Sequence, residues 1–87
     1  MKNLNTKKTK NISGNQIYLK RISMRMSQAE LSAHMQHYGV NIGQEGISKI
    51  ETGSRCVSDV ELLILAKIFG VSMEWLVRGD NNETPPR

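Results

Sequence analysis

Apolar residues recur at spacings of three and four along most of the chain, while the alternation that is typical of strands is scarce. Glycines follow the periodic segments at Gly39, Gly53, Gly70 and Gly79, where a left-handed residue ends a helix without steric cost. The pattern predicts five helices, at 15–24, 28–38, 44–52, 59–69 and 73–78. The sequence therefore predicts an all-α fold, a compact five-helix bundle in one domain.

Helix starts are marked by serines. The segments SQAE at 27–30 and SDVE at 58–61 each place a serine before a helix and a glutamate three positions later. In such a capping box the serine accepts from a first-turn amide and the glutamate reaches back to the amide of the serine. We expect Ser72 to cap the last, short helix through its hydroxyl.

The periodic apolar positions of the last four helices define the expected core. They are Leu31, Met35, Tyr38, Ile47, Ile50, Leu62, Leu63, Leu65, Ala66, Phe69, Trp75 and Leu76. In the first helix Ile17, Arg21 and Met24 share a face, but Leu19 and Ile22 lie off it. The sequence leaves the rotation of this helix open.

Polarity and charge separate the two ends of the chain from its middle. Residues 1–12 and 80–87 are polar and without periodicity, so we expect flexible tails on either side of a domain at 13–79. The net charge is +4, and the lysines of the N-terminal tail account for the whole excess. A basic tail fits a polyanionic partner such as nucleic acid.

Several classes of protein do not fit this sequence. The longest apolar run, LLILA, is too short to span a bilayer, and the N-terminus lacks the apolar stretch of a signal peptide, so we expect a cytoplasmic protein. His34 and His37 share a helix face, but only the distant Cys56 offers a further soft ligand, so we expect no metal site and no cofactor. No catalytic motif is present, and we expect no enzyme.

Three segments carry a family resemblance. MSQAELSAHM, ISKIETGSR and VELLILAKIFGVSMEWLVRG follow one another in the order found in phage repressor and Cro-type regulators, the XRE family. The chain resembles that DNA-binding domain over residues 14–79. The resemblance implies a helix-turn-helix made of helices 28–38 and 44–52, and a transcriptional repressor that binds a roughly palindromic double-stranded DNA operator as a homodimer.

The resemblance and the residue chemistry together predict two sets of DNA contacts. The residues expected to contact bases are Gln44, Glu45, Gly46, Ser48 and Lys49. The residues expected to contact phosphates are Gln28, Asn41, Thr52, Ser54 and Arg55. Two of these positions have alternatives. Gly46 fits either a close approach to DNA or a tight helix contact, and Arg55 could simply be solvated.

Three further features accompany the motif. The resemblance implies an ion pair between Arg21 and Glu51, and it gives Ser32 the role of a small residue where the two motif helices cross. The connection between those helices is about five residues longer than the family pattern. We expect the second helix to end at Gly39, with the apolar residues after it turned inward around an exposed Asn41.

A protein-binding module is the main alternative. The same fold could dock a partner protein, as an antitoxin docks the toxin that it neutralises. Trp75, Leu76 and Val77 could form such a contact or a homodimer contact, although Trp75 fits the core equally well. Salt-dependent binding to duplex DNA of defined sequence separates the two functions.

Overall fold

The computed structural model describes residues 9–79, and within them the chain forms five helices and no strand. The helices are α1 (Gly14–Ser23), α2 (Gln28–His37), α3 (Gln44–Glu51), α4 (Asp59–Phe69) and α5 (Met73–Arg78). Each boundary lies within one residue of its predicted position. The all-α prediction is confirmed for this part of the chain, while residues 1–8 and 80–87, which belong to the predicted tails, lie outside the described range.

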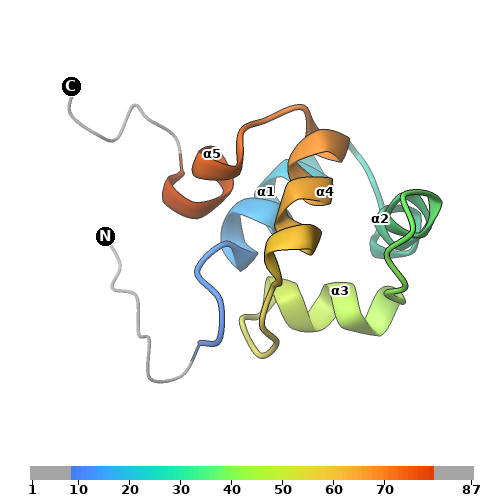
Figure 1. Ribbon diagram of the computed structural model, residues 1–87, viewed down its shortest axis with the longest axis horizontal. Helices are drawn as coiled ribbons and strands as arrows, with labels where there is room; N and C mark the ends of the chain where they lie inside the picture. Colours follow the sequence, from blue (N-terminus) through green and yellow to red (C-terminus); the bar gives the residue numbers. More distant parts are fainter. Residues whose placement is uncertain (1–8, 80–87) are drawn as a thin grey trace.

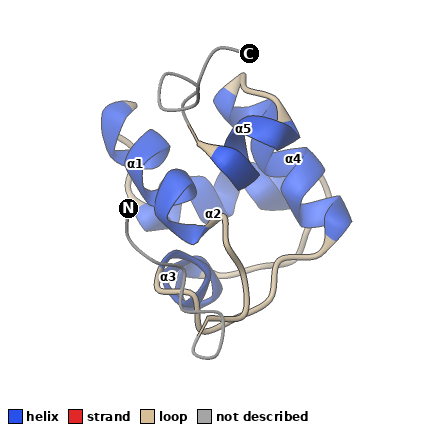
Figure 2. Cartoon of the chain, turned by 90° about the vertical axis from the view of Figure 1, so that its left-hand side faces the viewer, coloured by secondary structure: helices blue, strands red, loops and turns tan. Residues whose placement is uncertain are grey.

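The helices surround one core, with α3 at one end of the molecule. Figure 1 shows α3 crossing below the other helices, and Figure 2 shows it almost end-on in the same position. The core is formed by the buried residues Ile17, Leu31, Met35, Ile42, Ile47, Ile50, Leu65, Ala66, Phe69 and Leu76. Every helix contributes to it, so each depends on the others to bury its apolar face.

The predicted caps are present. Ser27 and Ser58 each accept from the amide of a glutamate three positions on, and both glutamates bond back to the serine amide. Ser72 accepts from the amide of Trp75 at the start of α5. In contrast, α3 begins after Gly43 and has no side-chain cap. The start of α3 must therefore be fixed by contacts from outside the helix.

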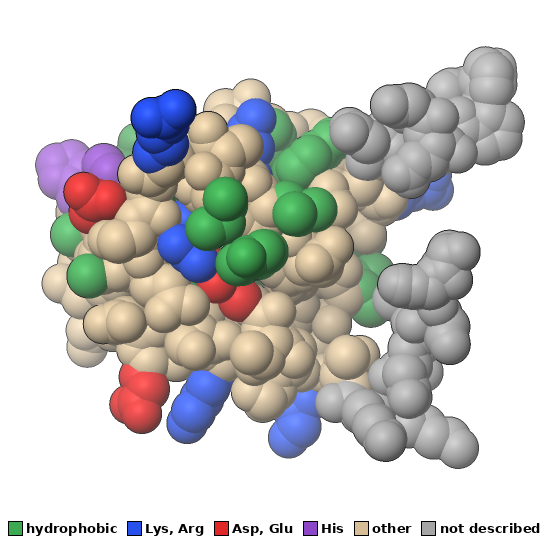
Figure 3. All heavy atoms as spheres, turned by 180° about the vertical axis from the view of Figure 1, so that it is seen from behind, with side chains coloured by type: hydrophobic (Ala, Val, Ile, Leu, Met, Phe, Trp, Pro, Cys, Tyr) green, Lys and Arg blue, Asp and Glu red, His purple; other side chains and the backbone are tan. Residues whose placement is uncertain are grey.

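The structure settles the rotation of α1. Ile17 and Arg21 point into the molecule, whereas Tyr18, Leu19 and Ile22 are 42 to 48% exposed on the opposite face. Figure 3 shows hydrophobic side chains gathered near the middle of this side of the molecule. Burial of an arginine in place of an apolar residue is the reason why the apolar pattern did not reveal the inner face.

Two core predictions were wrong and one contact prediction needs correction. Tyr38 and Leu63, expected in the core, are 49 and 45% exposed. Tyr38 follows the last residue of α2, so the chain already turns away from the core there. Leu76, offered as a dimer contact, is fully buried within the chain and has no surface to present to a partner.

Candidate nucleic-acid interface

The outer surface of α3 is polar because its apolar residues all face the core. Ile47 and Ile50 are fully buried, while Gln44, Glu45 and Lys49 are exposed and Ser48 is half-buried. Successive helix residues are about 100° apart, so Glu45, Ser48 and Lys49 point outward and Gln44 lies at the edge next to α2. The structure thus brings the predicted base-contacting residues to one surface, with Gly46 at its other edge.

A chain of hydrogen bonds ties Gln44 to the first turn of α2. Its side-chain nitrogen donates to Oε1 of Gln28 at 3.3 Å, and Nε2 of Gln28 donates to Oε1 of Glu51 at 3.0 Å. The first residues of α2 and α3 are therefore held beside each other. Since helix N-termini carry unpaired amides and a partial positive charge, this part of the surface suits a phosphate.

The predicted pair of Arg21 and Glu51 is present and buried. Nε and Nη2 of Arg21 donate to the two carboxylate oxygens of Glu51 at 2.6 and 3.0 Å, and the two side chains are only 8 and 5% exposed. Nη1 of Arg21 donates to the carbonyl of Met26 at 2.7 Å. The hydrogen bonds to Glu51 raise the pKa of Arg21 despite the opposing effect of burial. This two-pronged geometry joins α1 to the last turn of α3.

Gly46 has a structural reason to be glycine. A Cβ atom at this position would lie 2.6 Å from Cγ1 of Ile42, whose side chain is 4% exposed. Real Cβ atoms do not approach other atoms so closely, so a larger residue would displace a buried side chain. Of the two alternatives for Gly46, tight packing accounts for the glycine, and contact with DNA stays a prediction.

The loop after α3 uses its hydroxyls within the protein. Oγ1 of Thr52 and Oγ of Ser54 both donate to the carbonyl of Lys49, at 3.2 and 3.3 Å. The two hydroxyls also lie 3.2 Å from each other. Both side chains are exposed, so each hydroxyl can turn toward a phosphate by giving up these long hydrogen bonds. Asn41 is exposed in the connection between α2 and α3, as predicted.

Arg55 has partners that the sequence did not indicate. Its Nη2 atom lies 3.0 Å from Oε2 of Glu61, the capping glutamate of α4. Its Nη1 atom is buried and has no hydrogen-bond partner among residues 9–79. The guanidinium is thus partly committed to holding the loop against α4, and a phosphate contact by Arg55 stays a prediction.

Asn11 is a residue that sequence reasoning missed. Its oxygen accepts from the amides of Ser13 and Gly14 at the start of α1, at 3.0 and 2.7 Å. Its nitrogen donates to the carbonyls of Ile50 and Arg55, at 3.0 and 2.8 Å. An asparagine shortly before a helix is a known turn signal, but nothing in the sequence pointed to carbonyls so far along the chain. Asn11 lay within the tail expected at 1–12, yet it is anchored to the domain.

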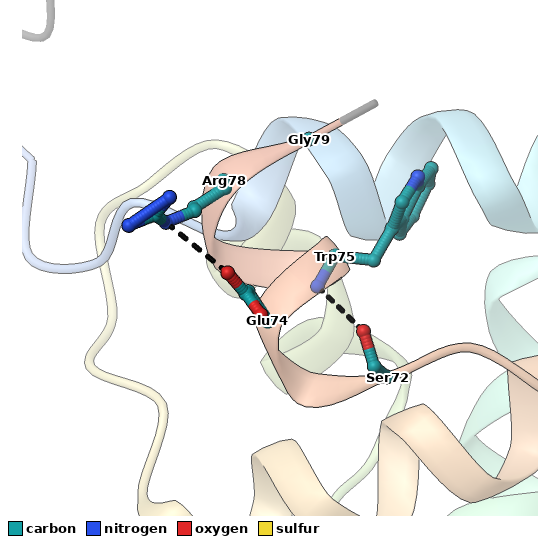
Figure 4. A pocket seen from close by; sticks show the side chains of 5 residues that line it. All are labelled: Ser72, Glu74, Trp75, Arg78 and Gly79. Carbon is teal, nitrogen blue, oxygen red and sulfur yellow. Dashed lines mark hydrogen bonds and ion pairs between the residues drawn. The ribbon is translucent and has the colours of Figure 1, made fainter. Parts of the chain in front are cut away.

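The half-buried Trp75 shares its surface with α1. The ammonium of Lys20 lies 5.8 Å from the centre of the indole ring, and Figure 4 shows Trp75 at the side of α5 that faces α1. Val77 is 37% exposed. Of the three residues offered as a dimer contact, Trp75 and Val77 therefore have surface available.

Residues 9–79 contain neither a candidate membrane span nor a candidate metal-binding cluster. None of the helices within residues 9–79 is long and apolar enough to cross a membrane. The same residues contain no group of three histidine, cysteine, aspartate or glutamate side chains placed to hold a metal ion.

Comparison with known proteins agrees with this geometry. A family profile described as helix-turn-helix matches residues 17–76. Among solved structures, the chain is similar to the P22 c2 repressor protein, crystallised in complex with a synthetic operator. The two share 27% sequence identity with a TM-score of 0.68, and the match covers 80% of this chain and 98% of that one. No curated protein matches the chain.

The match covers well over half of the chain and spans all five helices, from Ile17 in α1 to Leu76 in α5. The protein is a helix-turn-helix domain of the phage repressor and Cro type. The chain belongs to the helix-turn-helix family.

Proposed function

We propose that this chain is a cytoplasmic transcriptional repressor that binds a roughly palindromic operator as a homodimer and places α3 in the major groove. Its family makes it a sequence-specific, DNA-binding regulator. The proposal rests mainly on the exposed polar surface of α3. The hydrogen bond from Gln44 to Gln28 holds the start of this helix beside the start of α2. The similarity to a repressor that was crystallised with a synthetic operator supports binding to operator DNA.

The side chains on α3 have the chemistry to read base edges. Glutamine can bond to both N6 and N7 of adenine, lysine donates to O6 and N7 of guanine, and glutamate accepts from N4 of cytosine. Gln44, Lys49 and Glu45 provide these three groups, with Ser48 between them as a small donor or acceptor. These residues are proposed to determine sequence preference.

A second set of residues is proposed to hold the phosphate backbone. The starts of α2 and α3, with Gln28 in the first, offer amides to one strand. The exposed Asn41, Thr52 and Ser54 flank α3 at its two ends, where they could contact phosphates on either side of the groove. Contacts of this kind position the protein and carry little sequence information.

The dimer is proposed to form through the surface near α5. Val77 and the half-buried Trp75 supply apolar area there, and their helix lies at the opposite end of the molecule from α3. Burial of this area between two copies would leave α3 exposed in each of them. Sedimentation of the free protein over a range of concentrations measures whether this dimer exists without DNA.

The deciding experiment is selection of bound duplexes from a random pool, followed by titration of the selected duplex over a range of salt concentrations. We expect a defined, roughly palindromic sequence, and log K falling linearly with log salt by about 0.9 for each phosphate neutralised. Failure to enrich any duplex at low salt would contradict the proposal. That result would favour the alternative of a protein-binding module, such as an antitoxin.

A further inference from the structure

The connection between α2 and α3 is held at one residue, Ile42. This residue lies two positions before the first residue of α3, and its carbonyl accepts two side-chain hydrogen bonds from α2. Oγ of Ser32 and Nε2 of Gln36 each donate to that oxygen at 2.9 Å. Nε2 of Gln36 also lies 3.3 Å from Oγ of Ser32. The two donors are four residues apart, so they occupy one face of α2.

The side chain of Ile42 is fixed by packing, as its carbonyl is by hydrogen bonds. It is 4% exposed and packs directly over Gly46, where a Cβ atom would collide with it. Ile42 thus contacts α2 through its backbone and α3 through its side chain. Movement of the start of α3 relative to α2 would break the hydrogen bonds or open a gap in the core.

The start of α3 has no side-chain cap. The helices α2, α4 and α5 are each preceded by a serine whose hydroxyl accepts a hydrogen bond from a first-turn amide. Gly43, which precedes α3, provides no such cap. The remaining tie is the hydrogen bond of Gln44 to Gln28, which is exposed and 3.3 Å long. The contacts of Ile42 are shorter and better buried, so they dominate the placement of this end of the helix.

We propose that Ser32, Gln36 and Ile42 form a latch that positions the start of the recognition helix, and that this latch contributes to sequence specificity without touching DNA. The inference rests on the proposed function. Ser32 and Gln36 are positioning residues, because they act on Gln44 and Glu45 through Ile42. A small shift of the helix start moves these side chains relative to base edges, whereas the end of α3 stays fixed by Arg21 and Glu51.

The test compares the double variant Ser32→Ala/Gln36→Ala with His34→Ala, which changes an exposed residue of the same helix. In the free protein, we expect hydrogen exchange of the amide of Ile47, which donates to the carbonyl of Gly43 at the start of α3, to accelerate about tenfold in the double variant, with residues 49–51 little changed. On DNA, we expect the ratio of affinities for the selected duplex and its single-base variants to fall about tenfold at base pairs beneath the helix start. Binding to unrelated duplexes should hardly change, and His34→Ala should match the wild type in both measurements.

Wild-type exchange or an unchanged ranking of duplexes in a folded double variant would overturn the latch. Thermal melting establishes folding, and if the double variant fails to fold, the two single variants, which each leave one donor, replace it in both measurements. A wild-type protein without any sequence preference would refute the proposed function instead. In that case the exchange of the Ile47 amide alone decides whether Ile42 fixes the start of α3.

Discussion

Asn11 uses its entire side-chain hydrogen-bonding capacity at a single junction. Its two acceptor bonds satisfy the first amides of α1, and its two donor bonds satisfy carbonyls at and beyond the end of α3. Gly14 completes the junction, because a side chain there would collide with the carbonyl of Ile50. One amide therefore fastens the beginning of the domain to the helix proposed to read DNA.

Replacement of Asn11 by alanine should lower the free energy of unfolding by about 1–3 kcal/mol, since it leaves part-buried amides and carbonyls without partners. The measurement is chemical denaturation of the variant and the wild type. Asn15→Ala is the control, because Asn15 is exposed on α1 and its replacement should change stability by less than about 0.5 kcal/mol. Equal, small effects of the two variants would show that the junction contributes little.

Glu51→Ala should be far more damaging than Glu45→Ala. Removal of the buried carboxylate leaves Arg21 charged and unpaired, which costs about 3–5 kcal/mol, whereas Glu45 is exposed. Melting temperatures of the two variants measure the difference. Similar small shifts would mean that the pair does not support the fold.

The ion pair of Arg21 and Glu51 also predicts how the stability of the fold depends on pH. Glu51 raises the pKa of Arg21, so from neutral pH upward the stabilisation by the pair stays complete as far as the ordinary pKa of arginine and is lost only as pH rises beyond it. The gap in melting temperature between wild type and Glu51→Ala should therefore persist from about pH 7 to about pH 10. A gap that closes within this range would contradict the assignment.

Residue roles were predictable from the sequence only in part. Arg21 and Glu51 were found because the family resemblance pairs them, but their burial could not be read from an apolar pattern. Ser32 was interpreted as a small residue at a helix crossing, and its acceptor, the carbonyl of Ile42, lies in a connection of unpredictable conformation. Arg55 was assigned to phosphate from the family resemblance and the chemistry of its guanidinium, and its carboxylate partner on α4 could not be read from the sequence because the two become neighbours only in the folded chain.

Among the helices, α3 is the one expected to carry sequence preference. Gln44→Ala and Lys49→Ala should each relax the preference at one or two base pairs per half-site, by about 1–3 kcal/mol. Asn41→Ala should instead weaken binding to all duplexes about equally, since a phosphate contact is blind to sequence. The measurement is binding of each variant to a panel of single-base changes in the selected duplex. An unchanged ranking with both α3 variants would place recognition elsewhere on the protein.

The elements themselves were largely predictable. Helix boundaries were right to within one residue because capping serines and terminal glycines act locally and are visible in the sequence. The rotation of each helix about its axis was harder to predict. Apolar residues of α1 and Leu63 of α4 lie on exposed faces. Which side of an apolar helix meets its neighbours is decided by the packing of all five helices, and no single segment contains that information.

At the scale of the molecule, part of the positive charge of residues 9–79 is committed to ion pairs. Arg21, Arg55 and Arg78 are paired with glutamates, and the basic side chains of this range without such a pair are Lys10, Lys20, Arg25, Lys49 and Lys67. The N-terminal sequence before residue 9 adds Lys2, Lys7 and Lys8. Deletion of residues 2–8, which keeps the anchored Asn11, should weaken binding to all duplexes. It should also lower the salt slope by about 0.9 for each phosphate that the shortened protein no longer neutralises.

Replacement of Lys2, Lys7 and Lys8 by glutamine is the matched test of charge alone, and we expect it to reproduce the deletion. Titration against selected and unrelated duplexes measures both effects. A deletion that instead alters the preference for particular bases would make the segment a reader of sequence. In that case the lysines do more than attract phosphates.

The anchoring of Lys10 and Asn11 beside the end of α3 has a practical consequence for protein engineering. The amide of Lys10 donates to the carbonyl of Gly53 at 2.7 Å. Anything fused before residue 9 therefore joins the domain next to α3, the helix proposed to read DNA. The last described residue, Gly79, instead follows α5, which lies at the other end of the molecule in Figures 1 and 2. Purification tags and fluorescent reporters on the carboxyl side therefore stay clear of α3, but they lie next to the surface proposed for the dimer and should be removed before sedimentation.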